Sequence, residues 1–378
     1  MITLFFILIA AFGVSAMTWL FPWVASRSVP KVVPIRPAAP EKVSRFSIIV
    51  PAHNEEATIV QTLTSIQAAI SALKSVRPEI EVEVLLGADG CHDRTVQLAK
   101  AFPVQIFEAN PGQGKWKTIN QLVAKTEKSN WIVLADAGII WPANFLVESV
   151  VQCEKSGVVG LSPTYRNPSA GKVEEAIWNL ETWLKAMENQ AGGPVSVHGA
   201  SVLYRRKELV EALEHLGSMS SHWLNDDVAI AMSIRLRHPE SKIVYLTHLG
   251  TWDCPEAVGV GPVAKPVREF ARRKRMVIGN LQWIRSILLK DWARNEVAAL
   301  VALRRVFRLL WAYWMVALVL ATALIVGPVV SIIVSVCGLV AGVAVLGARP
   351  FQMLSDACLV SLLAPYYLVS GKGMSRWK

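Results

Sequence analysis

Four polar motifs each follow a short apolar run of the chain, and their side chains are suited to binding a charged ligand. The motifs are His-Asn-Glu-Glu at 53–56, Asp-Gly-Cys-His-Asp at 89–93, Asn-Pro-Gly-Gln-Gly-Lys at 110–115 and Asp-Ala-Gly at 136–138. Carboxylates accept hydrogen bonds or hold a cation, and a lysine pairs with phosphate. One aspartate at a strand end is more often a helix cap than a ligand. Four motifs in series at one sheet edge indicate a nucleotide-sugar site.

Two adjacent acids, Asp226 and Asp227, precede a predicted helix over residues 228–237. A sugar hydroxyl is a poor nucleophile, so a one-step displacement at a sugar carbon requires a positioned carboxylate base. Adjacent carboxylates raise one another's pKa, which suits that task. The alternative is that the pair only offsets the dipole of the helix. The other motifs favour the catalytic interpretation.

These side chains need a fold that brings several strand ends together. Over residues 46–255, short apolar runs alternate with helical stretches such as 55–73, 115–126 and 173–188. The runs that we interpret as strands are FSIIVPA, VEVLLGA, VQIFEA, WIVLADA, GVVGLS, SVLY and KIVYL. This alternation predicts an α/β fold with a mostly parallel, doubly wound sheet, in which ligands bind at the carboxyl ends of the strands.

The order and spacing of the motifs resemble those of family 2 glycosyltransferases with the GT-A fold, especially the membrane-bound synthases of the cellulose, chitin and hyaluronan type. The resemblance extends over residues 47–282. It implies a Rossmann-like GT-A domain that transfers a sugar from a UDP-sugar with inversion. The motifs are specific at the level of the superfamily and do not identify the sugar.

The resemblance also implies roles for the nucleotide-binding residues. Asp89 corresponds to the aspartate that binds the uracil base, and Asp93 is the next acid of the same motif. Glu55 matches another position that contacts the nucleotide. Lys115 matches the lysine of a Gly-Lys motif and directs a positive charge toward the phosphates.

The metal and the base are implied in the same way. Asp136 matches the first acid of an Asp-x-Asp motif that binds Mg²⁺ or Mn²⁺, and Gly138 replaces the second acid. One carboxylate can still hold Mg²⁺ together with phosphates and water, because this ion usually keeps several waters. Asp227 matches the base that deprotonates the acceptor, with Asp226 as its neighbour.

The last motif of the family, Gln-x-x-Arg-Trp, is the least well matched. Arg275 is retained and can pair with the diphosphate, whereas Arg272 and Met276 replace the glutamine and the tryptophan. The missing tryptophan supplies an aromatic platform for the acceptor sugar in the family, so Met276 argues against processive polymerisation. A purely structural alternative is that these basic residues anchor a helix at a membrane interface.

Composition indicates a membrane partner for the positive charge. The chain is 53% hydrophobic and only 18% charged, below the roughly 25% of soluble domains. Residues 265–308 hold twelve Lys and Arg against three acids, so they carry +9 of the net charge of +10. This cluster precedes a long apolar run, which favours an anionic membrane surface over nucleic acid. The five cysteines form no CxxC pair, which argues against a zinc site or a disulfide framework.

We therefore predict five segments. They are a transmembrane helix at 1–26, a basic Pro-rich linker at 27–45, the GT-A domain at 46–256, a basic amphipathic interfacial segment at 257–308, and two to three transmembrane segments at 309–371. A cleaved signal peptide is the alternative for the first segment, and a re-entrant or interfacial course is the alternative for the last. The basic linker predicts a cytoplasmic catalytic domain on a multi-pass cell-membrane protein, in the inner membrane if the source is bacterial.

The function predicted in this way is inverting transfer from a UDP-sugar to a lipid-linked or oligosaccharide acceptor at the cytoplasmic membrane face. Membrane lipids are expected partners and nucleic acid is not. One alternative is a processive polysaccharide synthase. The other is a catalytically silent nucleotide-binding membrane scaffold, which the departures at Gly138, Arg272 and Met276 favour.

Overall fold

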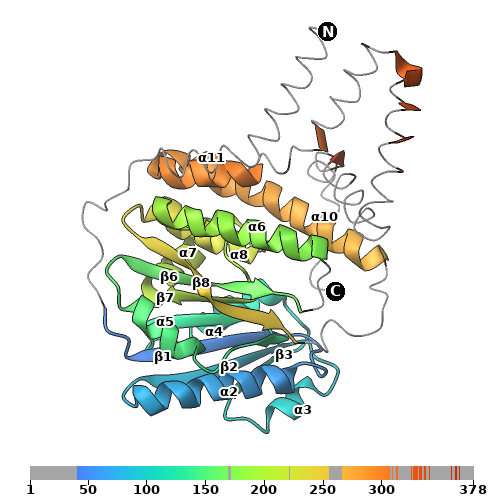
Figure 1. Cartoon of the computed structure of the whole chain (residues 1–378). Coiled ribbons are helices and arrows are strands. Elements are labelled where there is room, and N and C mark those ends of the chain that lie inside the picture. Colours follow the sequence, from blue (N-terminus) through green and yellow to red (C-terminus); the bar gives the residue numbers. More distant parts are fainter. Residues whose placement is uncertain are drawn as a thin grey trace.

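The computed structural model describes residues 41–168, 172–220, 222–254 and 266–306, together with scattered residues between 309 and 366. Its centre is an eight-stranded sheet with the order β3-β2-β1-β4-β7-β6-β8-β5 (Figure 1). The strands are β1 (Arg45–Ala52), β2 (Glu81–Asp89), β3 (Gln105–Ala109), β4 (Trp131–Ala135), β5 (Ile139–Ile140), β6 (Val158–Arg166), β7 (Ser201–Arg205) and β8 (Lys242–Asp253).

The sheet is mostly parallel, as predicted, because six of its eight strands run in one direction, but two reversed strands make it mixed. Strands β3, β2, β1 and β4 run parallel to one another, and β6 runs parallel to β8. Strand β7 runs antiparallel to both β4 and β6, and β5 runs antiparallel to β8. Because β7 is reversed, its first residue, Ser201, pairs with Ala135 at the carboxyl end of β4. The loop that leads into β7 therefore reaches the edge of the sheet where the parallel strands end.

Helices cover both faces of the sheet, with α2 and α3 on one side and α6, α10 and α11 on the other (Figure 1). The helices are α2 (Ile59–Val76), α3 (Thr95–Ala99), α4 (Lys115–Val123), α5 (Phe145–Cys153), α6 (Lys172–Glu188), α7 (Arg206–Met219), α8 (Asp226–Arg237), α10 (Pro266–Trp283) and α11 (Leu289–Asp291). Side chains alternate along each strand, which produces two apolar cores. Leu134 and Tyr204 belong to one core, and Val133 and Leu203 belong to the other.

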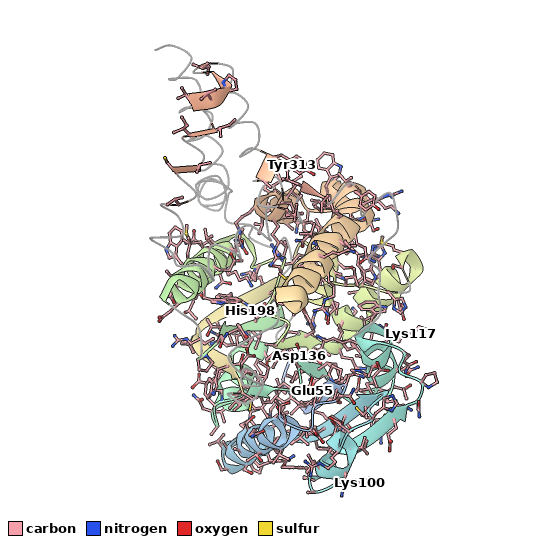
Figure 2. The ribbon with its side chains drawn as sticks, turned by 90° about the vertical axis from the view of Figure 1, so that its right-hand side faces the viewer. Glu55, Lys100, Lys117, Asp136, His198 and Tyr313 are labelled. Atoms are coloured by element: carbon pink, nitrogen blue, oxygen red, sulfur yellow. The ribbon has the colours of Figure 1, made fainter. Side chains whose placement is uncertain are left out.

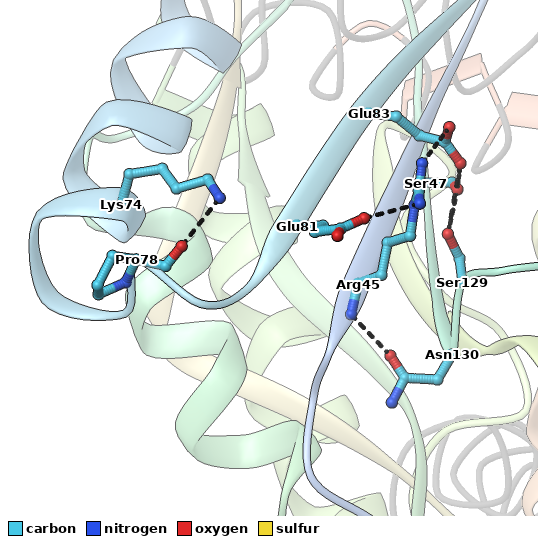
Figure 3. Close-up of polar contacts among 8 residues, drawn as sticks. All are labelled: Arg45, Ser47, Lys74, Pro78, Glu81, Glu83, Ser129 and Asn130. Carbon is cyan, nitrogen blue, oxygen red and sulfur yellow. Dashed lines mark hydrogen bonds and ion pairs between the residues drawn. The ribbon is translucent and has the colours of Figure 1, made fainter.

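An ion-pair cluster joins the amino ends of β1 and β2, at the opposite end of the sheet from the polar motifs. Arg45 contacts Glu81 at 2.7 Å and Glu83 at 3.0 Å across the two strands (Figure 3). The backbone N–H of Arg45 also donates to the Asn130 side chain at 3.2 Å, which attaches the start of β1 to the residue before β4. These contacts support the register that brings the carboxyl ends of the strands to one level.

The apolar side chains of the predicted interfacial segment pack on the α/β domain. Trp283, Ile287 and Leu288 are at most 5% exposed and belong to the same core as α4, α7 and α8. Arg304, counted above with the membrane-facing charges, is 3% exposed and pairs with Glu181 and Glu188 of α6 at 2.9 and 2.8 Å. Assigning this charge to a lipid surface was wrong, because two acids of the same chain neutralise it.

The predicted transmembrane segments at 1–26 and 309–371 lie outside the described residues, apart from scattered positions of the second, and so does most of the linker at 27–45. Among the helices of the described ranges, none combines the length and the apolar character needed to cross a membrane.

Candidate active site

Three of the predicted site residues meet at the carboxyl end of β4. Lys115 is the first residue of α4, Asp136 directly follows β4, and Asp226 is the first residue of α8. The Lys115 Nζ atom lies 2.7 Å from Asp136 Oδ1 and 3.2 Å from Asp226 Oδ2. Figure 2 shows Glu55 and Asp136 next to each other in the middle of the domain. Residues 111 positions apart in the sequence are thus brought into one ionic cluster.

A small pocket lies beside this cluster, with a cavity volume of about 10 Å³. Its lining includes the charged residues Lys115, Asp136, Asp226 and Asp227, together with Tyr204. Gly199, from the loop before β7, completes the wall: a Cβ atom there would lie 3.3 Å from the Cβ of Asp227, tighter than ordinary contact. A glycine at position 199 therefore lets this loop approach the acid pair closely.

Burial and the neighbouring charges shift the pKa values of the residues in this cluster. Burial would lower the pKa of Lys115, but the carboxylates of Asp136 and Asp226 outweigh it and raise that pKa above its usual value. Burial raises the pKa of Asp136, and the ammonium of Lys115 only partly offsets this effect. Burial also raises the pKa of Asp227, and the charge of Asp226 raises it further. Asp227 thus has the environment of a general base, with a pKa moved toward neutrality.

Asp89 holds the loop that leads into α4. Asp89 is only 2% exposed. Its two carboxylate oxygens accept hydrogen bonds from the backbone N–H groups of Gln113 at 2.6 Å and Gly114 at 2.7 Å. The loop passes so close that a Cβ at Gly90 would lie 2.9 Å from the backbone of Gly112, and Gly90 has φ +63. Asp89 therefore positions Lys115, a role that the motif did not reveal. Its contact with a uracil base stays a prediction.

Replacing Asp89 by alanine is expected to lower the free energy of unfolding by about 2–3 kcal/mol, because two partly buried backbone donors lose a charged acceptor. Chemical denaturation of the full chain measures this change. Glu108→Ala, which removes an exposed acid of neighbouring β3, is the matched control and should change stability by less than about 0.5 kcal/mol. Equal stability of the two variants would contradict the anchoring role of Asp89.

Asp93 and Glu55 connect the loops that follow β1 and β2. Asp93 accepts the backbone N–H groups of Thr95 and Glu56, each at 3.0 Å. Burial would raise the pKa of Asp93, but a hydrogen bond from the Thr95 hydroxyl and the two backbone hydrogen bonds outweigh it and lower the pKa. Glu55 accepts a hydrogen bond from the Thr58 hydroxyl at 2.9 Å. Burial raises the pKa of Glu55, and the nearby charge of Asp136 adds to this effect.

The two arginines of the last motif lie on α10. Arg275 is exposed, and its charge lowers the pKa of Asp136, so the structure brings it toward the cluster. The side chain of Arg272 lies outside the described part of the structure. The binding and catalytic roles implied for all nine site residues stay predictions.

Helix α10 also holds the turn that presents the acid pair. The Asn225 side chain, one residue before Asp226, donates to the Met276 carbonyl at 3.0 Å and to Asn280 Oδ1 at 3.1 Å. A Cβ at Gly279 would lie 2.5 Å from Asn225, so only glycine permits this contact. Sequence reasoning assigned no role to Asn225, Gly279 or Asn280, because the contacting residues are about 50 positions apart.

The site offers few protein ligands for a cation, so the substrate would supply most of the others. Within the described ranges, no group of three or more His, Cys, Asp or Glu side chains is arranged to hold a metal ion. Asp136 offers one carboxylate with 39% exposure, which fits a Mg²⁺ or Mn²⁺ ion bound mainly by donor phosphates and water. Gly138 has φ +98, a conformation in which a side chain is strained, so a second acid at this position has a backbone cost.

A buried polar cluster behind Asp227 was missed by sequence reasoning. His198 Nε2 lies 3.0 Å from the Tyr245 hydroxyl and 3.4 Å from Lys185 Nζ. Burial lowers the pKa of His198, and burial lowers that of Lys185 to about 8. The charge of Lys185 in turn lowers the pKa of Asp227, so the cluster is electrostatically coupled to the acid pair. These residues come from elements whose adjacency only the fold reveals.

Comparison with known proteins identifies a family and a fold for this chain. Residues 47–213 match the family model for glycosyl transferase family 2. Among solved structures, the chain is similar to the mannosyltransferase PcManGT from Pyrobaculum calidifontis in complex with GDP-Man and Mn²⁺. The TM-score is 0.68 and the identity 17%, over 96% of this chain and 99% of that chain. No sequence among the curated proteins matches significantly.

Two further solved structures are more distant. Glucosyl-3-phosphoglycerate synthase from Mycobacterium tuberculosis, in complex with Mn²⁺, UDP and phosphoglyceric acid, has a TM-score of 0.41 and 18% identity over 64% of this chain and 78% of that chain. S. aureus TarS 1–349 has a TM-score of 0.46 and 12% identity over 87% of this chain and 92% of that chain.

The α/β sheet and the PcManGT likeness define a protein with the GT-A fold. The family match makes the assignment more specific: the chain carries a family 2 glycosyltransferase domain and is a glycosyltransferase.

Proposed function

We propose that this glycosyltransferase transfers a sugar, with inversion, from a nucleoside-diphosphate sugar to a hydroxyl acceptor. The observation that carries the proposal is the pocket in which Lys115, Asp136, Asp226 and Asp227 converge from three separate elements. A lysine and several acids around one small pocket suit a reaction in which a proton leaves the acceptor and negative charge leaves with the diphosphate.

In this proposal, Asp227 takes the proton of the acceptor hydroxyl. The acceptor oxygen forms a bond to the anomeric carbon, and the bond from that carbon to the diphosphate oxygen breaks with its electron pair. Lys115 and Arg275 stabilise the departing charge, because both bring cationic groups to the cluster. A divalent cation at Asp136 would supply further neutralisation of the diphosphate when it is bound.

We propose UDP as the nucleotide, from the match of Asp89 to the family's uracil-binding aspartate. The solved structure of PcManGT is a complex with GDP-Man, so the donor assay includes guanine nucleotides. A preference for a GDP-sugar would contradict the UDP assignment and leave the transferase assignment intact.

A lipid-linked or glycan acceptor at the cytoplasmic face of the cell membrane is proposed for the second substrate. Two features support this location. Residues 309–347 carry no charge over 39 positions, long enough for two spans. Leu289 and Trp292, just ahead of that run, are 66% and 54% exposed on the described surface. Exposed apolar side chains near a membrane-directed segment suit contact with the interface.

The test is nucleotide release by membranes that contain the full chain. A panel of UDP- and GDP-sugars is offered with Mn²⁺ or Mg²⁺ and a crude lipid extract. We expect release with one donor, dependent on the extract and abolished by a chelator. Product length then separates single transfer from processive synthesis. Micromolar nucleotide binding with no release from any donor would contradict the proposal and favour the silent scaffold.

The rate is expected to depend on pH through Asp227. A base must be ionised to accept a proton, and burial raises the pKa of Asp227 above its ordinary value. The ratio kcat/KM should therefore be constant above that raised pKa and fall about tenfold per unit of pH below it. Asp226 raises this pKa, whereas Arg305, Lys185 and Lys115 lower it. An acidic limb at or below the usual aspartate range would contradict the assignment of the base.

A further inference from the structure

Tyr204 combines complete burial with an unpaired hydroxyl beside the acid pair. The residue is 0% exposed, and its Oη atom has no hydrogen-bond partner. Of the buried side-chain polar atoms without a partner in the described ranges, only this one belongs to a residue that lines the pocket. Buried polar groups are nearly always paired, so an exception at a reaction site points to a partner that arrives with the substrate.

The position of the ring is determined by its strand. Tyr204 lies on β7, where it pairs with Ile132 of β4 and Gly160 of β6. A Cβ at Gly160 would lie 3.2 Å from the Tyr204 ring, so glycine at this position leaves room for the ring. Val202, two residues earlier on the same face of the strand, also lines the pocket. The phenol is thus held on the pocket side of the sheet.

The pocket that Tyr204 lines has room for one oxygen atom. Its cavity of about 10 Å³ is close to the space that one water molecule occupies. Burial raises the pKa of Tyr204, and the charges of Asp227 and Asp226 raise it further. The hydroxyl therefore keeps its proton and can act as a hydrogen-bond donor.

We propose that the Tyr204 hydroxyl donates a hydrogen bond to the acceptor oxygen that Asp227 deprotonates. This inference rests on the function proposed above. The acceptor O–H points to Asp227, one lone pair accepts the Tyr204 proton in a hydrogen bond, and the other attacks the anomeric carbon. Tyr204 keeps its proton throughout, while the acceptor proton passes to Asp227 and the diphosphate leaves with its electron pair.

Such a bond acts mainly on the transition state. The acceptor oxygen becomes more negative as its proton moves to Asp227, and a hydrogen bond to a charged oxygen is stronger than one to a neutral oxygen. An interaction that strengthens in the transition state raises kcat and leaves the binding of the donor unchanged. Tyr204 would also orient the hydroxyl of whichever acceptor enters the pocket.

The experiment compares the wild-type full chain with Tyr204→Phe, using the donor and lipid extract that give nucleotide release with the wild-type protein. We expect kcat to fall about 10- to 100-fold, as for a lost hydrogen bond to a charged group, with donor KM and nucleotide Kd within about twofold. The melting temperature should not fall, because the substitution removes an unpaired buried hydroxyl.

Tyr245→Phe is the matched control, since its hydroxyl is also in a buried residue but is bonded to His198 at 3.0 Å. This variant should lower the melting temperature, in contrast to Tyr204→Phe. An unchanged kcat in Tyr204→Phe, a fall in its melting temperature, or a rise in donor KM alone would each overturn the inference. An inactive wild-type protein with every donor would instead contradict the proposed function itself.

Discussion

Replacement of Asp227 by asparagine is expected to reduce sugar transfer about a thousandfold and to leave nucleotide binding within about twofold. The amide has nearly the shape of the carboxylate but cannot accept the acceptor proton. The ion pairs of Lys115 involve Asp136 and Asp226, so the substitution leaves these contacts in place. Nucleotide release measures the rate, and calorimetric titration with the nucleotide measures binding.

The Asp227→Asn protein should be no less stable than the wild-type protein. Burial raises the folded-state pKa of Asp227, so ionisation of this group costs stability as pH rises through that value. A neutral amide removes this cost at neutral pH. Glu214→Gln makes the same exchange at an exposed position of α7 and is the matched control. Retention of more than a tenth of the activity in Asp227→Asn, with Glu214→Gln fully active, would exclude Asp227 as the base.

The second large effect is expected for Asp136→Asn, which should lower kcat/KM about a hundredfold and remove most of the stimulation by Mn²⁺. Asp136 is the only acid of its motif, because Gly138 stands in the second position. A neutral amide is a weaker ligand for a divalent cation than a carboxylate, and it also removes the partner of Lys115 at 2.7 Å. The effect is measured as the reaction rate at increasing Mn²⁺ concentrations. The rate in the presence of a chelator serves as the metal-free baseline.

A second readout separates metal binding from catalysis. In the wild-type protein, nucleotide affinity should rise when Mn²⁺ is added, and in Asp136→Asn this increase should disappear. Glu108→Gln alters an exposed acid of β3 that has no role in the site, so it should keep the Mn²⁺ effect on affinity. Equal Mn²⁺ dependence in the wild-type protein and Asp136→Asn would assign the cation to other residues.

Much of the site was predictable because polar motifs follow strands that run in parallel. The motifs that contain Glu55, Asp89 and Asp136 lie at the carboxyl ends of β1, β2 and β4, and these three strands are adjacent and parallel. Carboxyl ends of adjacent parallel strands meet at one edge, so the order of the motifs was enough to bring these residues together. The direction of β7 was not predictable, because a short apolar run pairs in either direction.

Contacts between residues far apart in the chain could not be predicted, because the local sequence pattern does not encode them. The basic face of residues 257–308 suggested a lipid surface, yet Arg304 pairs with two acids of α6 more than 100 residues earlier. Asp89 matched a nucleotide-binding aspartate, yet both its oxygens accept backbone N–H groups 24 and 25 residues later. A charged residue has the same appearance in a sequence whether its partner is solvent, ligand or a distant side chain.

The sequence alone determined the α/β class, the family 2 glycosyltransferase domain and the acids and lysine that line one end of the sheet. These follow from the period of apolar residues and from the motifs at strand ends, which are local properties of the chain. Only the tertiary structure decided that Lys115 joins Asp136 to Asp226, that α10 supports Asn225, and that Tyr204 lines the same pocket as the acid pair. Each of these depends on distances between elements far apart in the chain, and packing of the two cores sets those distances.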